Sequence, residues 1–172
     1  MPLFQSSVLS RFLENQDKSK VKLAYRRFTK YFLDTEIQKN IFSLKEEEYQ
    51  GLFLNELFVN VLGYTMKPNV GYNLAAEFKN QNNSRKADGA ILDDDKAIGI
   101  IELKGTNTTN LEEVKEQAFS YKVNHEGCNY VITSNFNKLW FYINNAVEHE
   151  SFDLFNLTEE RFEVLYLCIA KE

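Results

Sequence analysis

The sequence predicts an α/β fold in which a central mixed β-sheet is flanked by helices and preceded by an N-terminal helical section. Apolar residues recur with helical spacing over 18–33 and again over 49–64. Two short apolar runs, 86–92 and 97–104, flank a tight acidic turn and indicate neighbouring strands. Two further apolar runs within 130–143, separated by a turn, indicate a β-hairpin.

A chain of 172 residues corresponds to about one domain and is long enough to bury a substantial core. We expect residues 1–65 to form helices that pack on a core made by residues 66–172. Short helices are expected over 1–16 and 36–48, and Gly63 suits the C-terminal cap of the apolar helix that follows them. The whole chain is therefore expected to be one structural domain.

The second part of the chain supplies the remaining elements. Residues 72–78 read as the first strand, and 111–123 as a helix between the two strand pairs. Thr158 is a candidate cap for a closing amphipathic helix.

Composition excludes several classes of protein. The two cysteines show no C-x-x-C spacing and the two histidines are scattered, which argues against a zinc site. No apolar run approaches the ~20 residues of a membrane span, and no signal peptide is evident, so we expect no membrane partner and a cytoplasmic location. The net charge of −5 does not indicate a nucleic-acid binder, although basic contacts can be local.

The stretch around the acidic turn concentrates the candidate chemistry. Side chains alternate along a strand, so Glu102 and Lys104 share one face and Leu103 lies on the other. The turn at 93–95 folds the first strand back, which brings Asp88 beside Glu102. Two close carboxylates repel unless a cation lies between them, and such oxygen ligands suit Mg²⁺.

Four ordered sequence blocks then carry a family resemblance. They are Lys-Ala-Asp at 86–88, Ile-Glu-Leu-Lys at 101–104, Gln-Ala-Phe-Ser-Tyr at 117–121 and the hairpin at 129–143. In this order they resemble the N-terminal endonuclease domain of type IIG restriction-modification enzymes, in the PD-(D/E)XK superfamily. One position departs from that pattern, because Ala87 stands where the family has proline.

The resemblance implies a restriction-endonuclease-like core and Mg²⁺-dependent hydrolysis of phosphodiester bonds in double-stranded DNA. Asp88 and Glu102 would bind Mg²⁺, for which Mn²⁺ can substitute, and the backbone carbonyl of Leu103 would be a third ligand. Lys104 would stabilise negative charge in the transition state and orient the attacking water. Gln117 would line the site, the alternative being a surface residue beside a Tyr121 that belongs to the core.

The early helix offers a further acid in the family this chain resembles. Glu56 is the only charge in the apolar helix 49–64, so it is a candidate additional metal ligand. The alternative is a carboxylate at the helix edge that pairs with a surface lysine. The charged run 45–48 is expected to be a solvated surface.

A basic helix precedes these elements and offers a possible DNA footprint. Its candidate DNA-binding residues are Lys18, Lys22, Arg26, Arg27 and Lys30. Such a stripe can contact phosphates, but it can equally be a solvated helix face.

The resemblance also implies a larger context. We expect a fragment of a longer chain that carries methyltransferase and target-recognition domains, with S-adenosylmethionine serving only the methyltransferase. No methyltransferase motif is present here, since the only prolines are Pro2 and Pro68. Cleavage of both DNA strands suggests a transient dimer on DNA. A different class of function stays open, namely a non-catalytic nucleic-acid-binding or scaffolding module on a nuclease-like fold.

Overall fold

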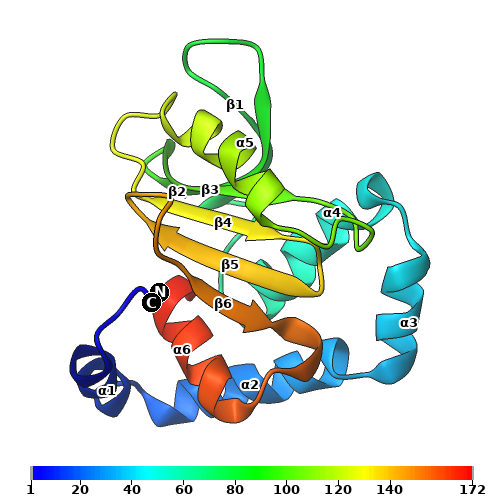
Figure 1. Ribbon diagram of the computed structural model, residues 1–172, viewed down its shortest axis with the longest axis vertical. Coiled ribbons are helices and arrows are strands. Elements are labelled where there is room, and N and C mark those ends of the chain that lie inside the picture. Colours follow the sequence, from blue (N-terminus) through cyan, green and yellow to red (C-terminus); the bar gives the residue numbers. More distant parts are fainter. Residues whose placement is uncertain (1, 172) are drawn as a thin grey trace.

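The computed structural model describes residues 2–171, which form a six-stranded sheet with helices on both faces (Figure 1). The helices are α1 (Ser6–Glu14), α2 (Lys18–Phe32), α3 (Thr35–Ser43), α4 (Glu46–Phe53), η1 (Leu54–Val61), α5 (Glu112–Lys122), η2 (Leu154–Asn156) and α6 (Glu159–Ile169). The strands are β1 (Leu74–Lys79), β2 (Lys86–Asp93), β3 (Lys96–Leu103), β4 (Tyr130–Ser134), β5 (Lys138–Ile143) and β6 (Glu150–Asp153). The predicted α/β architecture with a mixed, helix-flanked sheet is confirmed.

The strands lie in the sheet in their sequence order, from β1 to β6. Neighbouring strands are antiparallel except β3 and β4, which are parallel. A parallel pair needs a long crossover connection, and α5 supplies it between these two strands. Because of this crossover, the C-terminal ends of β3 and β4 lie side by side.

Each face of the sheet is covered by a different set of helices. Side chains such as Ile101 and Ile132 pack with α2, η1 and α6 in the larger hydrophobic core. The alternate residues Ile100 and Val131 lie on the other face, where α5 contributes Ala118 and Tyr121. Figure 1 shows α5 on one side of the sheet and α2 and α6 on the other. Strand β3 is therefore buried on both faces, as its nearly continuous apolar sequence requires.

The turn between β2 and β3 has the geometry that its acidic residues favour. Asp93 pairs with Lys96, which leaves a two-residue turn. Both turn residues have positive φ, 45° at Asp94 and 66° at Asp95. This is the backbone of a tight hairpin turn, where aspartate tolerates the left-handed region. The predicted fold-back is confirmed.

The N-terminal helices match the prediction closely in one place and differ in another. Helix α2 begins after Asp17, whose carboxylate accepts hydrogen bonds from the backbone N–H groups of Ser19 and Lys20. The single helix predicted over 36–48 is wrong, because α3 ends at Ser43 and α4 begins at Glu46. The short break reorients the chain, so that α4 starts beside the end of β3.

The long apolar helix continues from α4 into η1, whose hydrogen bonds follow the wider π-helical pattern. It ends where predicted, since Gly63 has a φ of 86°. Thr158 also caps α6 as predicted, accepting a hydrogen bond from the N–H of Arg161. No helix within residues 2–171 is long and apolar enough to cross a membrane.

Candidate active site at the ends of β2 and β3

Asp88 and Glu102 meet where the hydrogen-bonded ladder between β2 and β3 stops. The last paired residues at that end are Gly89 and Ile101, so Asp88 and Glu102 are the next residues along each strand. Oδ2 of Asp88 accepts a hydrogen bond of 2.7 Å from the backbone N–H of Leu103. The aspartate side chain thereby takes the role of a backbone acceptor, and the two acids predicted to converge do so.

Both carboxyl groups are disfavoured as anions in this position. Glu102 is only 2% exposed, and burial together with the neighbouring Asp88 raises its pKa to about 8. Burial also raises the pKa of Asp88, while the Leu103 N–H and the Lys104 ammonium oppose that shift. Oε2 of Glu102 is buried without a hydrogen-bond partner among the described residues. With both acids ionised, the pair would carry more negative charge than the surrounding protein groups compensate.

Lys104 supplies the nearest positive charge. Its Nζ lies 3.7 Å from Oε1 of Glu102 and 4.0 Å from Oε1 of Glu46. Its backbone N–H donates to the carbonyl of Ser134, which extends the parallel pairing of β3 with β4 by one residue. The alternation of β3 thus places the lysine over the glutamate, as the sequence predicts.

Glu46 is a site residue that the sequence analysis missed. The expectation of a solvated run at 45–48 is wrong for this residue, which is partly buried and faces Lys104. Its charge also contributes to raising the pKa of Asp88. The loop after β3 touches the start of α4, because a Cβ added to Gly105 would lie 3.7 Å from the Cβ of Glu46. An acid at the first position of an amphipathic helix is the only local signal, and it is shared by many solvated helix ends.

Glu56 lies in a different environment. It accepts a hydrogen bond of 3.2 Å from the Asn60 side chain on the same helix. Burial raises the pKa of the Tyr31 and Tyr49 hydroxyls, and the charge of Glu56 adds to both shifts. No contact recorded for residues 2–171 joins it to the Asp88–Glu102 pair, so its role as a ligand stays a prediction, and Glu46 is the early-helix acid that the structure brings close.

Gln117 and Tyr121 share one face of α5, as predicted from their spacing. Nε2 of Gln117 donates a hydrogen bond of 3.2 Å to the Tyr121 hydroxyl. The Tyr121 ring is buried, and the guanidinium of Arg85 lies 5.3 Å from its centre. Tyr121 is thus part of the core beneath α5, and the proposed catalytic role of Gln117 stays a prediction.

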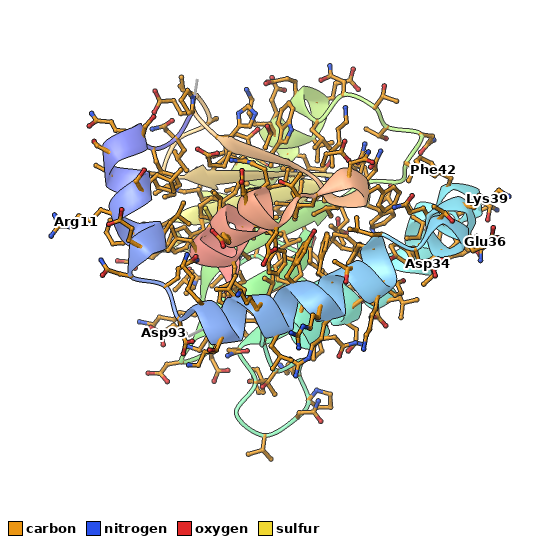
Figure 2. The ribbon with its side chains drawn as sticks, turned by 90° about the horizontal axis from the view of Figure 1, so that it is seen from below. Arg11, Asp34, Glu36, Lys39, Phe42 and Asp93 are labelled. Atoms are coloured by element: carbon orange, nitrogen blue, oxygen red, sulfur yellow. The ribbon has the colours of Figure 1, made fainter. Side chains whose placement is uncertain are left out.

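The basic residues of α2 are exposed but lie on the other side of the sheet. Lys18, Lys22, Arg26, Arg27 and Lys30 are all exposed. Figure 2 shows α2 lying across the lower face of the molecule, between Arg11 on α1 and Asp34 at the start of α3. Glu102 lies on the face that α5 covers, two residues after Ile100, whereas α2 packs on the opposite face. A single DNA molecule could therefore contact both the basic residues of α2 and the site only if it passed around the edge of the sheet.

The donor set fits a hard divalent cation. Mg²⁺ typically takes one or two protein carboxylates and keeps several waters, and the pair at Asp88 and Glu102 provides two carboxylates. The carbonyl of Leu103 points to the same side of β3 as its N–H, which faces Asp88. The described residues contain no cluster of three or more histidine, cysteine, aspartate or glutamate side chains suited to a metal ion. The orphaned Oε2 of Glu102 is consistent with a ligand atom.

Comparison with known proteins places this chain in a family. No curated protein and no solved structure matches the chain. Residues 45–156, about two thirds of the sequence, match the family described as type I restriction enzyme R protein N terminus (HSDR_N). The match spans all six strands and includes the site residues Glu46, Asp88, Glu102 and Lys104. Helices α1 to α3 lie outside it. The chain therefore belongs to this family of N-terminal restriction-enzyme domains.

Proposed function

We propose that this chain is the nuclease domain of a restriction enzyme, with a PD-(D/E)XK type of site that hydrolyses phosphodiester bonds of double-stranded DNA. The observation that carries the proposal is the pair of Asp88 with the buried Glu102, which has the Lys104 ammonium beside it. Membership of a restriction-enzyme family supports the same reading. A structural ion pair would account for Lys104, but it would leave a second acid and the orphaned Oε2 of Glu102 unexplained.

Asp88, Glu102 and the Leu103 carbonyl would hold Mg²⁺, with Mn²⁺ as a substitute. When bound, the cation would supply positive charge to the phosphate and lower the pKa of a bound water.

The chain's own residues have separate tasks in this scheme. The Leu103 N–H fixes the Asp88 carboxylate, so that ligand needs little rearrangement. Lys104 projects its ammonium over the same face and stabilises negative charge that develops on the phosphate oxygens. Oε1 of Glu46 lies 4.0 Å from that ammonium and would help to hold its position. Preorganised charges of this kind act more strongly in a partly buried site than in water.

The type of restriction system is the finer part of the proposal. The sequence blocks resemble type IIG enzymes, whereas the matching family is described from the type I R protein. We propose that a longer chain joins this nuclease to methyltransferase and target-recognition domains, with S-adenosylmethionine bound only there. A transient dimer on DNA would then cut both strands, and the enzyme would work in the cytoplasm.

Calorimetric titration of Mn²⁺ into the protein tests the site directly. Wild type should bind the cation and Asp88→Asn should not, with circular dichroism showing that the fold is intact. Asp93→Asn is the matched control, because Asp93 is an exposed aspartate at the other end of the same strand. Figure 2 shows Asp93 on the side of the molecule opposite Phe42 of α3. Cleavage should then be assayed in the full-length enzyme.

Two results would count against the proposal. Equal loss of binding in both aspartate variants would indicate a nonspecific charge effect. Absence of binding in wild type, repeated with a short DNA duplex present, would favour a non-catalytic nucleic-acid-binding or scaffolding module.

A further inference from the structure

Thr133 on β4 is the cross-strand partner of Glu102 on β3. The two residues are Cα partners in the parallel pairing of β3 with β4. Paired residues on adjacent strands direct their side chains to the same face of a sheet, here the face covered by α5. Thr133 has no exposed surface, and its hydroxyl oxygen has no hydrogen-bond partner among the described residues.

Both residues of this cross-strand pair carry an unpartnered polar atom. Oε2 of Glu102 is also buried without a hydrogen-bond partner. A buried polar group without a partner is unfavourable, and proteins rarely leave two such groups on adjacent residues. A hydroxyl can donate and accept whereas a carboxylate oxygen accepts, so the two groups are chemically complementary.

The acidic side chain of Asp88 on β2 flanks Glu102 from the other side of β3, whereas the side chains that precede Glu102 and Thr133 on their shared face are apolar. Ile100 and Val131 lie two residues before Glu102 and Thr133 on the same face, and both are fully buried. Ala118 of α5 covers Val131 from above. The polar atoms of Glu102 and Thr133 therefore sit at the rim of an apolar layer, close to the strand end where Lys104 lies and with Asp88 beside Glu102 on β2.

We propose that Thr133 is a positioning residue for the metal site. Through one water molecule, its hydroxyl would hold the Glu102 carboxylate in the orientation in which that carboxylate binds the divalent cation. This inference rests on the proposed function, because it takes Glu102 to be a ligand. Adjacent strands lie about 4.8 Å apart, a spacing that one bridging water can span with two ordinary hydrogen bonds. The hydroxyl fixes this water and the water fixes the orientation of the carboxylate, as outer hydrogen bonds commonly do around metal ligands.

The proposal makes opposite predictions for the metal-free and metal-loaded protein. Thr133→Val keeps the shape of the side chain and removes the hydroxyl. The metal-free variant should melt at the same temperature as wild type or higher, because an unsatisfied buried hydroxyl is gone. Its Mn²⁺ affinity by calorimetry should nevertheless fall about 10- to 100-fold. Thr133→Ser restores the hydroxyl and should bind Mn²⁺ within about threefold of wild type.

Tyr142→Phe is the matched control. Tyr142 is a fully buried residue on β5 whose hydroxyl also lacks a partner, but its cross-strand neighbour is Val131 and not an acid. Its loss should leave Mn²⁺ affinity unchanged.

Each result bears on a different claim. Wild-type affinity in Thr133→Val would overturn the positioning role while leaving the proposed function intact. Equal loss of affinity in the valine and serine variants, with lowered melting temperatures, would show that Thr133 only supports packing and would also overturn it. No Mn²⁺ binding in wild type, with or without a DNA duplex, would overturn the proposed function, and this inference with it.

Discussion

The backbone N–H of Leu103 donates a 2.7 Å hydrogen bond to the carboxylate of Asp88, fifteen residues earlier in the chain. This bond takes the place of the next backbone hydrogen bond of the β2–β3 ladder. It therefore fixes the Asp88 carboxylate beside Glu102 at the end of the two strands. A ligand held by the main chain loses little conformational freedom when it binds. The residues around this bond make several testable predictions.

Lys104→Ala should lower DNA cleavage by the full-length enzyme at least 100-fold, since it removes the ammonium that stabilises charge on the phosphate. Metal affinity should stay within a few-fold of wild type, because the carboxylates and the Leu103 carbonyl remain. The check is cleavage kinetics together with calorimetry. Lys96→Ala is the control, as Lys96 is exposed at the opposite end of the same strand. Loss of metal binding in Lys104→Ala would contradict the role assigned to the lysine.

Stability of the metal-free protein should fall with rising pH because of Glu102. Its pKa is raised from 4.5 to about 8 in the folded protein, so the folded state holds a proton that the unfolded chain has released. The contribution is fully present below pH 4.5 and is lost as the pH rises through 8. At pH 9, Glu102→Gln should therefore melt on the order of 5–10 °C above wild type.

Thermal unfolding of both proteins between pH 5 and pH 9 measures this difference. The gap should narrow toward pH 5, where Glu102 is protonated in the folded state. A gap that does not change with pH would mean that the glutamine acts through packing and not through charge.

Glu46→Gln should slow cleavage by about tenfold with little change in metal affinity, because it frees the Lys104 ammonium from its second carboxylate. Glu47→Gln provides the comparison, since the next residue is exposed. Cleavage rates of the full-length variants at saturating metal distinguish the two. Equal cleavage rates in wild type, Glu46→Gln and Glu47→Gln would show that Glu46 forms only a surface ion pair and does not assist cleavage.

The paired change Arg26→Glu and Arg27→Glu tests whether α2 contacts DNA. If it does, affinity for a DNA duplex should fall and the dependence of binding on salt should become shallower, because phosphate contacts release counterions. Arg11→Glu with Lys39→Glu reverses the same number of charges on α1 and α3. Both are exposed and lie to either side of α2 in Figure 2. Similar binding by the two double variants would indicate a solvated helix face.

Local chemistry explains why much of the site was predictable. The period-two alternation of β3 separates Glu102 and Lys104 from Leu103, and the Asp94–Asp95 turn sets how β2 returns beside it. Thr158 marks a helix start for the same reason, since its side chain accepts a hydrogen bond from the backbone N–H of Arg161. These interactions span short segments, so their outcome can be read from neighbouring residues.

Glu46 and Thr133 depend on contacts that no local pattern contains. Glu46 reaches Lys104 only because the chain breaks between α3 and α4 and the new helix docks at the end of β3. Thr133 comes beside Glu102 only through the crossover that makes β3 and β4 parallel. The amino-acid order thus specifies the strands, the turn and the face on which each acid lies, because hydrogen bonding and side-chain alternation act over a few residues. Which distant side chains complete the site follows from the packing of helices on both faces of the sheet, where burial of apolar surface decides the arrangement.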